Sequence, residues 1–219
     1  IVPEISKREQ LIVKGYLADL YRHYKGEYEN ALPKYEELVE EYKALIATNN
    51  SVTLQLDCAH LLSRLADCYE GMGERVMYKN ALKGAIAFYN TIQDETIATK
   101  TRIATLHLSL ALAYSVDEEY EESFGYYQKA IDLYSYIYQS NPVSVTEYLG
   151  MAHRYYALSL EEDYEDKAVE QYSYSLRYYL EDSIYLGKSA TDVMEIFDEM
   201  FEYIYRNVIF KYLYNIFFY

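Results

Sequence analysis

The stretch HLSLALAYSVDEEYEESFGYYQKAIDLYSY, residues 107–136, decides the fold of this chain. Before its acidic turn, Leu110, Ala111 and Tyr114 form a stripe that is small in the middle and large on either side. A second stripe follows the turn and comprises Ser123, Tyr127, Ala130, Ile131 and Tyr134. Spacings of three, four, seven and eight residues place side chains on one face of an α-helix. The stretch therefore predicts a helical hairpin, helix A followed by helix B.

The same two stripes recur along the chain. The small residue of the first stripe is a marker alanine in four copies, separated by 48, 45 and 46 residues: Ala18, Ala66, Ala111 and Ala157. The second stripe ends on tyrosine in every copy: Tyr42, Tyr89, Tyr134 and Tyr179. A hairpin cannot bury its apolar face alone, so repeats of this kind must stack. The fold class predicted is all-α, a right-handed α–α superhelix of about four helical hairpins plus a C-terminal helix.

The spacing also predicts where the repeats lie. We expect repeat units at about 8–48, 53–94, 98–140 and 144–186, within a repeat domain spanning 1–188. A capping helix is expected at 189–219, with Tyr203 at the place of a fifth marker residue. Pro33 falls early in the second helix and is tolerable only near the first turn. The small position of that helix holds Tyr78 in the second copy, which predicts looser packing there.

The repeat resembles the tetratricopeptide family. Leu110-Ala111 with Tyr114 matches the large-small-large pattern of that family, and the stretch Gly26–Ala31 is similar to its turn and second-helix opening. The period near 45 exceeds the usual 34 of the family and is similar to the long-helix branch, which includes kinesin-light-chain-like repeats and Gram-positive peptide-pheromone receptors. The resemblance covers roughly residues 10–185 and implies a protein-binding function. The Lys and Asn cluster with which one subtype grips C-terminal carboxylates has no counterpart here.

Composition excludes several classes of function. The chain has 219 residues, with 35 acidic side chains against 20 basic ones and a net charge of −15. Nucleic-acid binding requires cations that displace phosphate counterions, so we expect no nucleic-acid partner. The apolar run from Tyr203 is 17 residues long and contains two cations, too short and too polar for a transmembrane segment. Cys58 and Cys68 are too far apart on one helix to form a disulfide, and no signal peptide is present, which favours a cytoplasmic location.

No pattern typical of catalysis is present. The four histidines fall one to each A helix, and none has the spacing of a metal site. The acidic runs are turns without the spacing of a calcium loop. We therefore expect no enzymatic activity, no cofactor and no metal ion.

Residues of helix A that point away from helix B form the candidate binding surface. In a superhelix of this type the A helices line the concave face. The partner-binding residues expected there are Tyr16, Asp19, Arg22, His60, Arg64, Asp67, Ser109, Leu112, Arg154, Tyr155 and Leu158.

The function predicted is a non-enzymatic scaffold that binds a protein or peptide on this concave face. Two alternatives remain open: a peptide-sensing regulatory domain of a larger signalling protein, and a self-assembling structural protein. For the C-terminal helix we expect a cap on the fourth hairpin, with a homodimer through this helix or insertion into a membrane surface or further repeat as the other readings. Its polar stripe is predicted to comprise Arg206, Asn207, Lys211 and Asn215.

Overall fold

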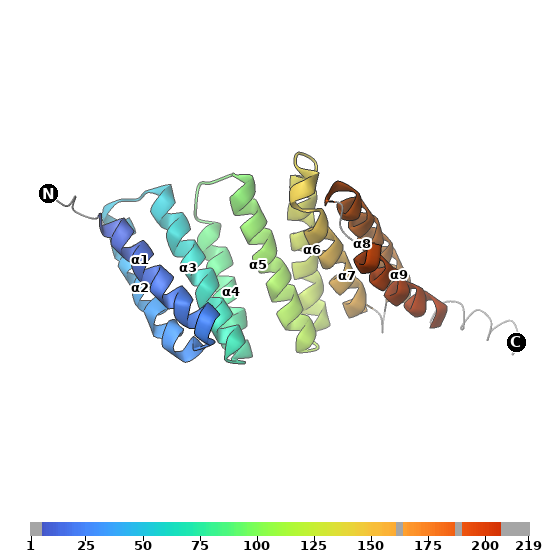
Figure 1. Ribbon diagram of the computed structural model, residues 1–219, viewed down its shortest axis with the longest axis horizontal. Coiled ribbons are helices and arrows are strands. Elements are labelled where there is room, and N and C mark those ends of the chain that lie inside the picture. Colours follow the sequence, from blue (N-terminus) through green and yellow to red (C-terminus); the bar gives the residue numbers. More distant parts are fainter. Residues whose placement is uncertain (1–5, 161–163, 187–189, 207–219) are drawn as a thin grey trace, which may run out of the picture. The chain divides into compact units, whose positions relative to one another are not determined.

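The computed structural model describes residues 6–160, 164–186 and 190–206, and all regular secondary structure in these ranges is helical (Figure 1). The chain divides into two compact units, Ile1–Thr99 and Lys100–Tyr219. The stripe of Arg206, Asn207, Lys211 and Asn215 lies outside the described residues apart from Arg206, which forms an ion pair with Glu202 (2.5 Å). The division into a repeat domain at 1–188 and a capping helix at 189–219 stays a prediction.

Unit 1 contains two helical hairpins. Its helices are α1 (Lys7–Leu20), extended by a π-helical turn (Tyr21–Lys25), α2 (Tyr28–Thr48), α3 (Val52–Gly71) and α4 (Arg75–Tyr89). Helix α1 begins at a capping box, in which the Ser6 hydroxyl accepts from the backbone N–H of Glu9 and the Glu9 carboxylate accepts from the backbone N–H of Ser6. Helix α2 packs against α1 and α3, and α3 packs against α4.

Unit 2 contains a further two hairpins and one more helix. Its elements are α5 (Ile97–Val116), α6 (Tyr120–Tyr138), a 3₁₀ turn (Pro142–Ser144), α7 (Thr146–Leu160), α8 (Glu165–Leu186) and α9 (Ala190–Ile204). The first three residues of α5 fall before the division between the units. Pro142 ends the preceding hairpin by opening the 3₁₀ turn, as its missing N–H predicts. Helices α6 to α9 pack against one another in chain order.

The turn between helices A and B has one geometry in the first three hairpins. One residue adopts a left-handed conformation: Gly26 (φ 61°), Gly73 (φ 74°) and Glu118 (φ 61°). The N–H of the next residue donates to the carbonyl of a tyrosine at the end of helix A: Glu27 to Tyr21, Glu74 to Tyr69 and Glu119 to Tyr114. This bond closes the helix end in the manner of a Schellman motif. The π-helical turn adds one residue to the first of these connections, which accounts for part of the longer first spacing.

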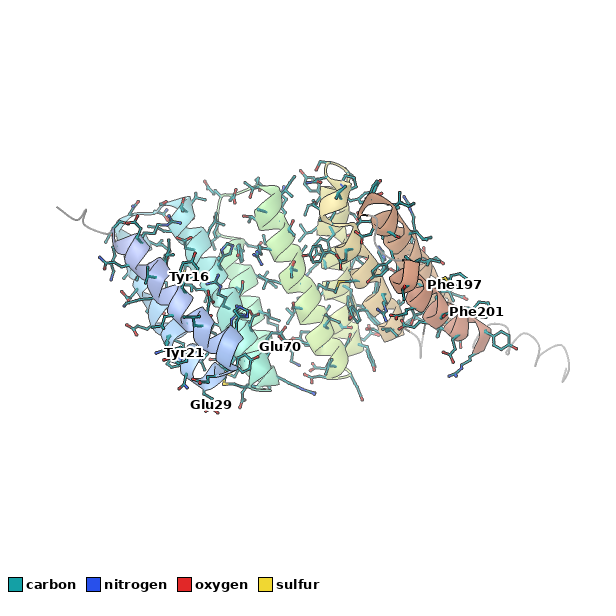
Figure 2. All side chains as sticks on the ribbon, in the orientation of Figure 1. Tyr16, Tyr21, Glu29, Glu70, Phe197 and Phe201 are labelled. Carbon is teal, nitrogen blue, oxygen red and sulfur yellow. The ribbon has the colours of Figure 1, made fainter. Side chains whose placement is uncertain are left out.

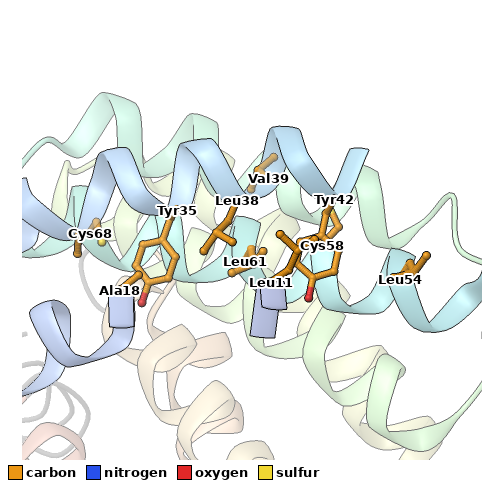
Figure 3. Packing of buried hydrophobic residues seen from close by; sticks show 11 residues of the cluster. Leu11, Ala18, Tyr35, Leu38, Val39, Tyr42, Leu54, Cys58, Leu61 and Cys68 are labelled. Carbon is orange, nitrogen blue, oxygen red and sulfur yellow. The ribbon is translucent and has the colours of Figure 1, made fainter. Parts of the chain in front are cut away.

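The predicted stripes form the core of each unit. All four marker alanines are 0 % exposed, and the terminal tyrosines of the first three helix B stripes are buried. Figure 3 shows the cluster of unit 1, in which Tyr35, Leu38 and Tyr42 of α2 pack between α1 and α3. Cys58 and Cys68 are buried in the same cluster as free thiols, and burial raises the pKa of each to about 11.

Three buried tyrosines of the B helices have hydrogen-bonded hydroxyls. Tyr35 donates to a carboxylate oxygen of Asp19 (2.5 Å), Tyr127 hydrogen bonds with the Ser115 hydroxyl (3.1 Å), and Tyr134 with the Thr105 hydroxyl (2.9 Å). In each pair, helix B contributes the ring and helix A contributes the polar partner. In these three pairs the ring fills the core while the hydroxyl is hydrogen-bonded, which is how a tyrosine is accommodated in a helical core.

Two expectations about helix B need qualification. Pro33 is the sixth residue of α2, so it lies early in this helix, as expected, but just beyond the first turn, where a proline costs least. Proline has no N–H, so the Glu29 carbonyl lacks its usual helical donor. Because Pro33 is exposed, water can donate to this carbonyl instead. Tyr78 is half-buried, whereas the small residues at the same position of the other copies, Ala31, Ser123 and Ala168, are fully buried.

The register of α9 differs by one residue from the expectation. Tyr203 packs its ring against Tyr172 with a centroid distance of 5.4 Å, and Tyr156 packs against Tyr127 at the same distance. Because Tyr127 and Tyr172 occupy equivalent positions of helix B, Tyr203 corresponds to Tyr156, the bulky residue before the marker, and not to the marker Ala157. Tyr203 is 7 % exposed and belongs to the core cluster of the fourth hairpin.

Candidate partner-binding surface

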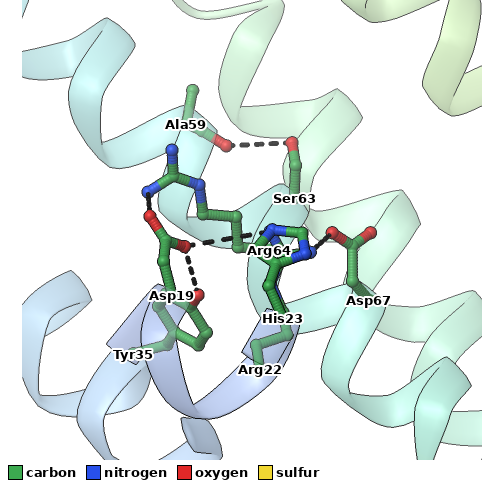
Figure 4. A network of polar contacts seen from close by, with 8 residues as sticks. All are labelled: Asp19, Arg22, His23, Tyr35, Ala59, Ser63, Arg64 and Asp67. Atoms are coloured by element: carbon green, nitrogen blue, oxygen red, sulfur yellow. Dashed lines mark hydrogen bonds and ion pairs between the residues drawn. The ribbon is translucent and has the colours of Figure 1, made fainter. Parts of the chain in front are cut away.

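Helices α1 and α3 present a network of charged side chains on the side of unit 1 that faces away from α2 and α4 (Figure 4). Arg22, in the π-helical turn that extends α1, forms an ion pair with Asp67 of α3, and Arg64 of α3 forms one with Asp19 of α1 (2.9 Å). Arg22 also lies 3.8 Å from Asp19. The two helices are thus joined by cross-linked pairs of opposite charge, which we call the four-charge network. It unites four of the residues predicted to bind a partner.

Because some of its side chains are buried, this network should contribute more to stability than an ordinary exposed ion pair. The Arg22 side chain is only 12 % exposed, and its Nε has no hydrogen-bond partner. Asp19 also accepts the hydroxyl of buried Tyr35 and so serves the core as well as the surface. Desolvation raises the pKa of Asp67, and the Arg22 guanidinium opposes this rise. Removal of one charge would leave its partner uncompensated, which costs more than loss of an exposed pair.

A pocket of about 200 Å³ lies beside the network in unit 1. Its buried lining comprises Leu11, Gly15, Tyr42 and Leu61. Its rim includes three residues of the predicted surface: Tyr16, His60 and Arg64. Asp57, also on the rim, is held by the Arg8 guanidinium through two hydrogen bonds of 2.7 and 3.2 Å. We call this hollow the Gly15 pocket.

In unit 2 the predicted residues divide between a pocket and the core. The Arg154 guanidinium binds both carboxylate oxygens of Glu199 on α9, at 3.0 and 2.5 Å. Arg154 and exposed Leu158 line a second pocket of about 320 Å³ together with residues of α8 and α9. Leu112 and Tyr155 instead pack against the core cluster of unit 2, and Ser109 is half-buried on α5.

Sequence reasoning identified neither Asp57 and Gly15 as residues of the Gly15 pocket nor Arg8 as the partner of Asp57. Arg8 and Asp57 lie 49 residues apart, and no local pattern connects them. Gly15 could have been identified from the sequence, because a glycine in the interior of a helix destabilises it and therefore indicates a structural or functional role.

Exposed apolar rows lie on the first and last described helices (Figure 2). On α1 the row comprises Val13, Tyr16, Leu17 and Leu20. On α9 the row comprises Met194, Phe197, Phe201 and Tyr205, with the aromatic rings stacked at 6.2 and 6.1 Å. Contiguous exposed apolar residues of this kind favour contact with another apolar surface.

The described residues contain no group of three or more His, Cys, Asp or Glu side chains that could hold a metal ion. None of the described helices has the length and hydropathy required to cross a membrane.

The comparisons with known proteins identify the fold. The sequence matches no protein-family model and no curated protein. Among solved structures, BtubC (BKLC) from P. vanneervenii is similar with a TM-score of 0.67 and 17 % identity over 90 % of this chain and 71 % of that one. A putative kinesin light chain from Podosopora anserina with nearly identical TPR-like repeats is similar with a TM-score of 0.54 and 15 % identity, over 91 % of this chain and 97 % of that one.

These neighbours are helical-repeat proteins, and identities of this size indicate the fold alone. The likeness extends over nine tenths of the chain in both cases. The chain is therefore an all-α protein with the tetratricopeptide-like helical-repeat fold.

Proposed function

We propose that this protein is a non-enzymatic scaffold that binds a protein or peptide segment on the exposed side of its A helices. The observation that carries this proposal is the surface of α1 and α3 in unit 1, where a pocket lined in part by buried Leu11 and Leu61 adjoins the four-charge network. A binding surface benefits from such ordering, because side chains already held in place lose less entropy when a partner docks. The fold itself supports an interaction role only by analogy.

The experiment compares two photo-crosslinking positions in the same unit. A photoreactive phenylalanine analogue replaces Tyr16 on α1, which is 64 % exposed, or Val76 on α4, which is 68 % exposed. Both positions are equally accessible, but only Tyr16 lies on the proposed surface. We expect a defined crosslinked protein from host extract at position 16 and none at position 76. Equal crosslinking at both, or crosslinking at 76 alone, would contradict the proposal.

Charge reversal is less suitable for this test. Arg64 is paired with Asp19 and Arg154 with Glu199, so a glutamate at either position would face a carboxylate within the chain. A loss of binding would then mix loss of a contact with local repulsion between like charges.

Self-association through α9 is the second candidate, and the position of Phe197 and Phe201 favours it. With Tyr203 equivalent to Tyr156, Phe197 is equivalent to Gly150, the residue at which α7 packs closely against Tyr179 of its own B helix. The aromatic row of α9 thus faces the side on which a B helix packs in the preceding hairpin, yet Phe197 and Phe201 are exposed.

The mass of the protein in solution tests this second candidate. Sedimentation equilibrium should show a dimer for the full chain and a monomer for Phe201→Glu, with Val116→Glu at an exposed apolar residue of α5 as the control. A monomeric full chain at high micromolar concentration would rule out self-association through α9.

A further inference from the structure

Gly15 lies in the interior of α1, where glycine destabilises a helix relative to alanine. Two structural reasons commonly account for such a glycine. One is a left-handed backbone conformation, and the other is the close approach of another group. Gly150 has the second reason, since a Cβ there would lie 2.9 Å from the ring of Tyr179. Gly15 has neither, because its φ is not positive and a Cβ there would meet no atom within 4 Å.

The space in front of Gly15 is the pocket itself. Gly15 is buried, so the open space is an internal hollow of the surface, unlike the solvent beside the exposed helical glycines Gly84 and Gly125. The pocket volume of about 200 Å³ corresponds to the liquid volume of roughly six water molecules. Water in contact with Leu11 and Leu61 makes no hydrogen bond to their side chains, so its displacement by an apolar group favours binding.

Every charged group described at the rim already has a partner within unit 1. Asp57 is bound by Arg8, and Arg64 is bound to Asp19. A charged ligand group entering the pocket would lose hydration without gaining an unpaired counter-charge, whereas an uncharged side chain loses little. The Arg64 guanidinium has five N–H donors, and Nη1 is the atom that meets Asp19, so further donors are suited to main-chain carbonyls of a bound segment.

We propose that the Gly15 pocket is the anchor site for one large uncharged side chain, of the leucine, methionine or phenylalanine type, carried by an extended segment of the partner. Gly15 keeps the pocket open, Leu11 and Leu61 contact the inserted side chain, and exposed Tyr16 covers it from the rim. This inference rests on the proposed scaffold function, but the pocket is testable without the partner.

The experiment uses the full chain and capped amino-acid amides as probes. Nitrogen-15 labelling of glycine yields a spectrum of eight residues, in which Gly15→Ala identifies the Gly15 amide. N-acetyl-leucinamide and N-acetyl-phenylalaninamide should shift this amide in a saturable way. N-acetyl-glycinamide and N-acetyl-lysinamide should bind at least about ten-fold more weakly, because one lacks the apolar group and the other brings a charge. Equal responses to all four probes, or an unmoved Gly15 amide, would overturn the proposal.

Two matched variants separate filling of the pocket from replacement of a helical glycine. In Gly15→Leu the new side chain occupies the pocket, and saturation-transfer signals of the leucine and phenylalanine probes should vanish. In Gly84→Leu, on the exposed side of α4, the signals should persist. Both variants should melt no lower than the wild type, since leucine favours a helix over glycine. Persistence of probe binding in Gly15→Leu would also overturn the proposal.

The outcomes separate this inference from the scaffold function. If the probes fail to bind while Tyr16 still crosslinks to a partner, the proposal of an anchor site is contradicted and the proposal of a scaffold function is supported. If the probes bind at Gly15 but no partner crosslinks at Tyr16, the proposal of an anchor site is supported and the proposal of a scaffold function is contradicted.

Discussion

His107 should make unit 2 less stable in mildly acidic solution. The side chain is 9 % exposed, its Nδ1 has no hydrogen-bond partner, and its ring stacks on Tyr126 at 5.9 Å. Burial, together with the nearby Lys129 ammonium, lowers its pKa from 6.5 to about 4. The folded protein therefore holds this imidazole neutral at a pH where the unfolded chain protonates it.

The direction and size of the effect follow from linkage between protonation and folding. Because the pKa of the folded state lies below that of the unfolded state, the stability from neutral His107 is complete above pH 6.5 and is lost as the pH falls toward 4. Between pH 7.5 and pH 5.5 the free energy of unfolding should fall by about 1.3 kcal/mol through this group alone. Work at pH 5.5 stays above the isoelectric point of about 4.7 and limits aggregation.

His107→Phe is the matched variant, because its ring retains the aromatic contact with Tyr126 but does not titrate. Urea unfolding followed by circular dichroism at pH 7.5 and 5.5 provides the free energies for both proteins. The decrease on acidification should be smaller in the variant by about 1.3 kcal/mol. His153, whose pKa burial also lowers, is present in both proteins, so its contribution cancels. An identical decrease in the two proteins would refute the reasoning.

Three further predictions concern packing and turns. Ala111→Leu should overpack the third hairpin and lower the free energy of unfolding by about 1–3 kcal/mol, because Ala111 is fully buried; an unchanged urea midpoint would contradict the assigned register. Glu118→Gly should stabilise the protein by about 1 kcal/mol, since Glu118 adopts the left-handed conformation that glycine adopts freely, whereas Gly73→Ala at the equivalent turn should destabilise it; thermal melting of both variants checks the pair, and shifts of the same sign would count against the turn assignment. Tyr203→Ala should cost about 3–5 kcal/mol and remove the protection of α9 in hydrogen exchange, because the ring fills the core cluster beside Tyr172; an unchanged exchange rate would mean that α9 does not pack there.

Local periodicity was sufficient to predict the helices and the residues they bury. The marker alanines and the tyrosine at the end of helix B recur at helical spacing, and a residue's face on a helix depends only on its position along that helix. The stretch Gly26–Ala31 was expected at a turn because it resembles the tetratricopeptide pattern, and Gly26 adopts the left-handed backbone there. Glu118 occupies the equivalent turn without being glycine, so propensity alone would not have identified its conformation.

The sequence could not predict which side chains of different helices pair with one another. Arg22 and Asp67 are 45 residues apart, as are Arg154 and Glu199, and their pairing depends on how far one helix slides against the next. A shift of a single residue in that packing turns different side chains toward the neighbour, which is why Tyr203 of α9 was assigned to the wrong position.

The sequence by itself determined the all-α repeat, its period and its core, because these follow from spacing within single helices. Only the tertiary structure decided that Arg64 and Arg154 are already paired, that His107 lacks a partner for Nδ1, and that Gly15 opens onto a pocket. The physical reason is that ion pairing, desolvation and free volume depend on atoms contributed by several helices, and their mutual positions are set by packing that no local pattern records.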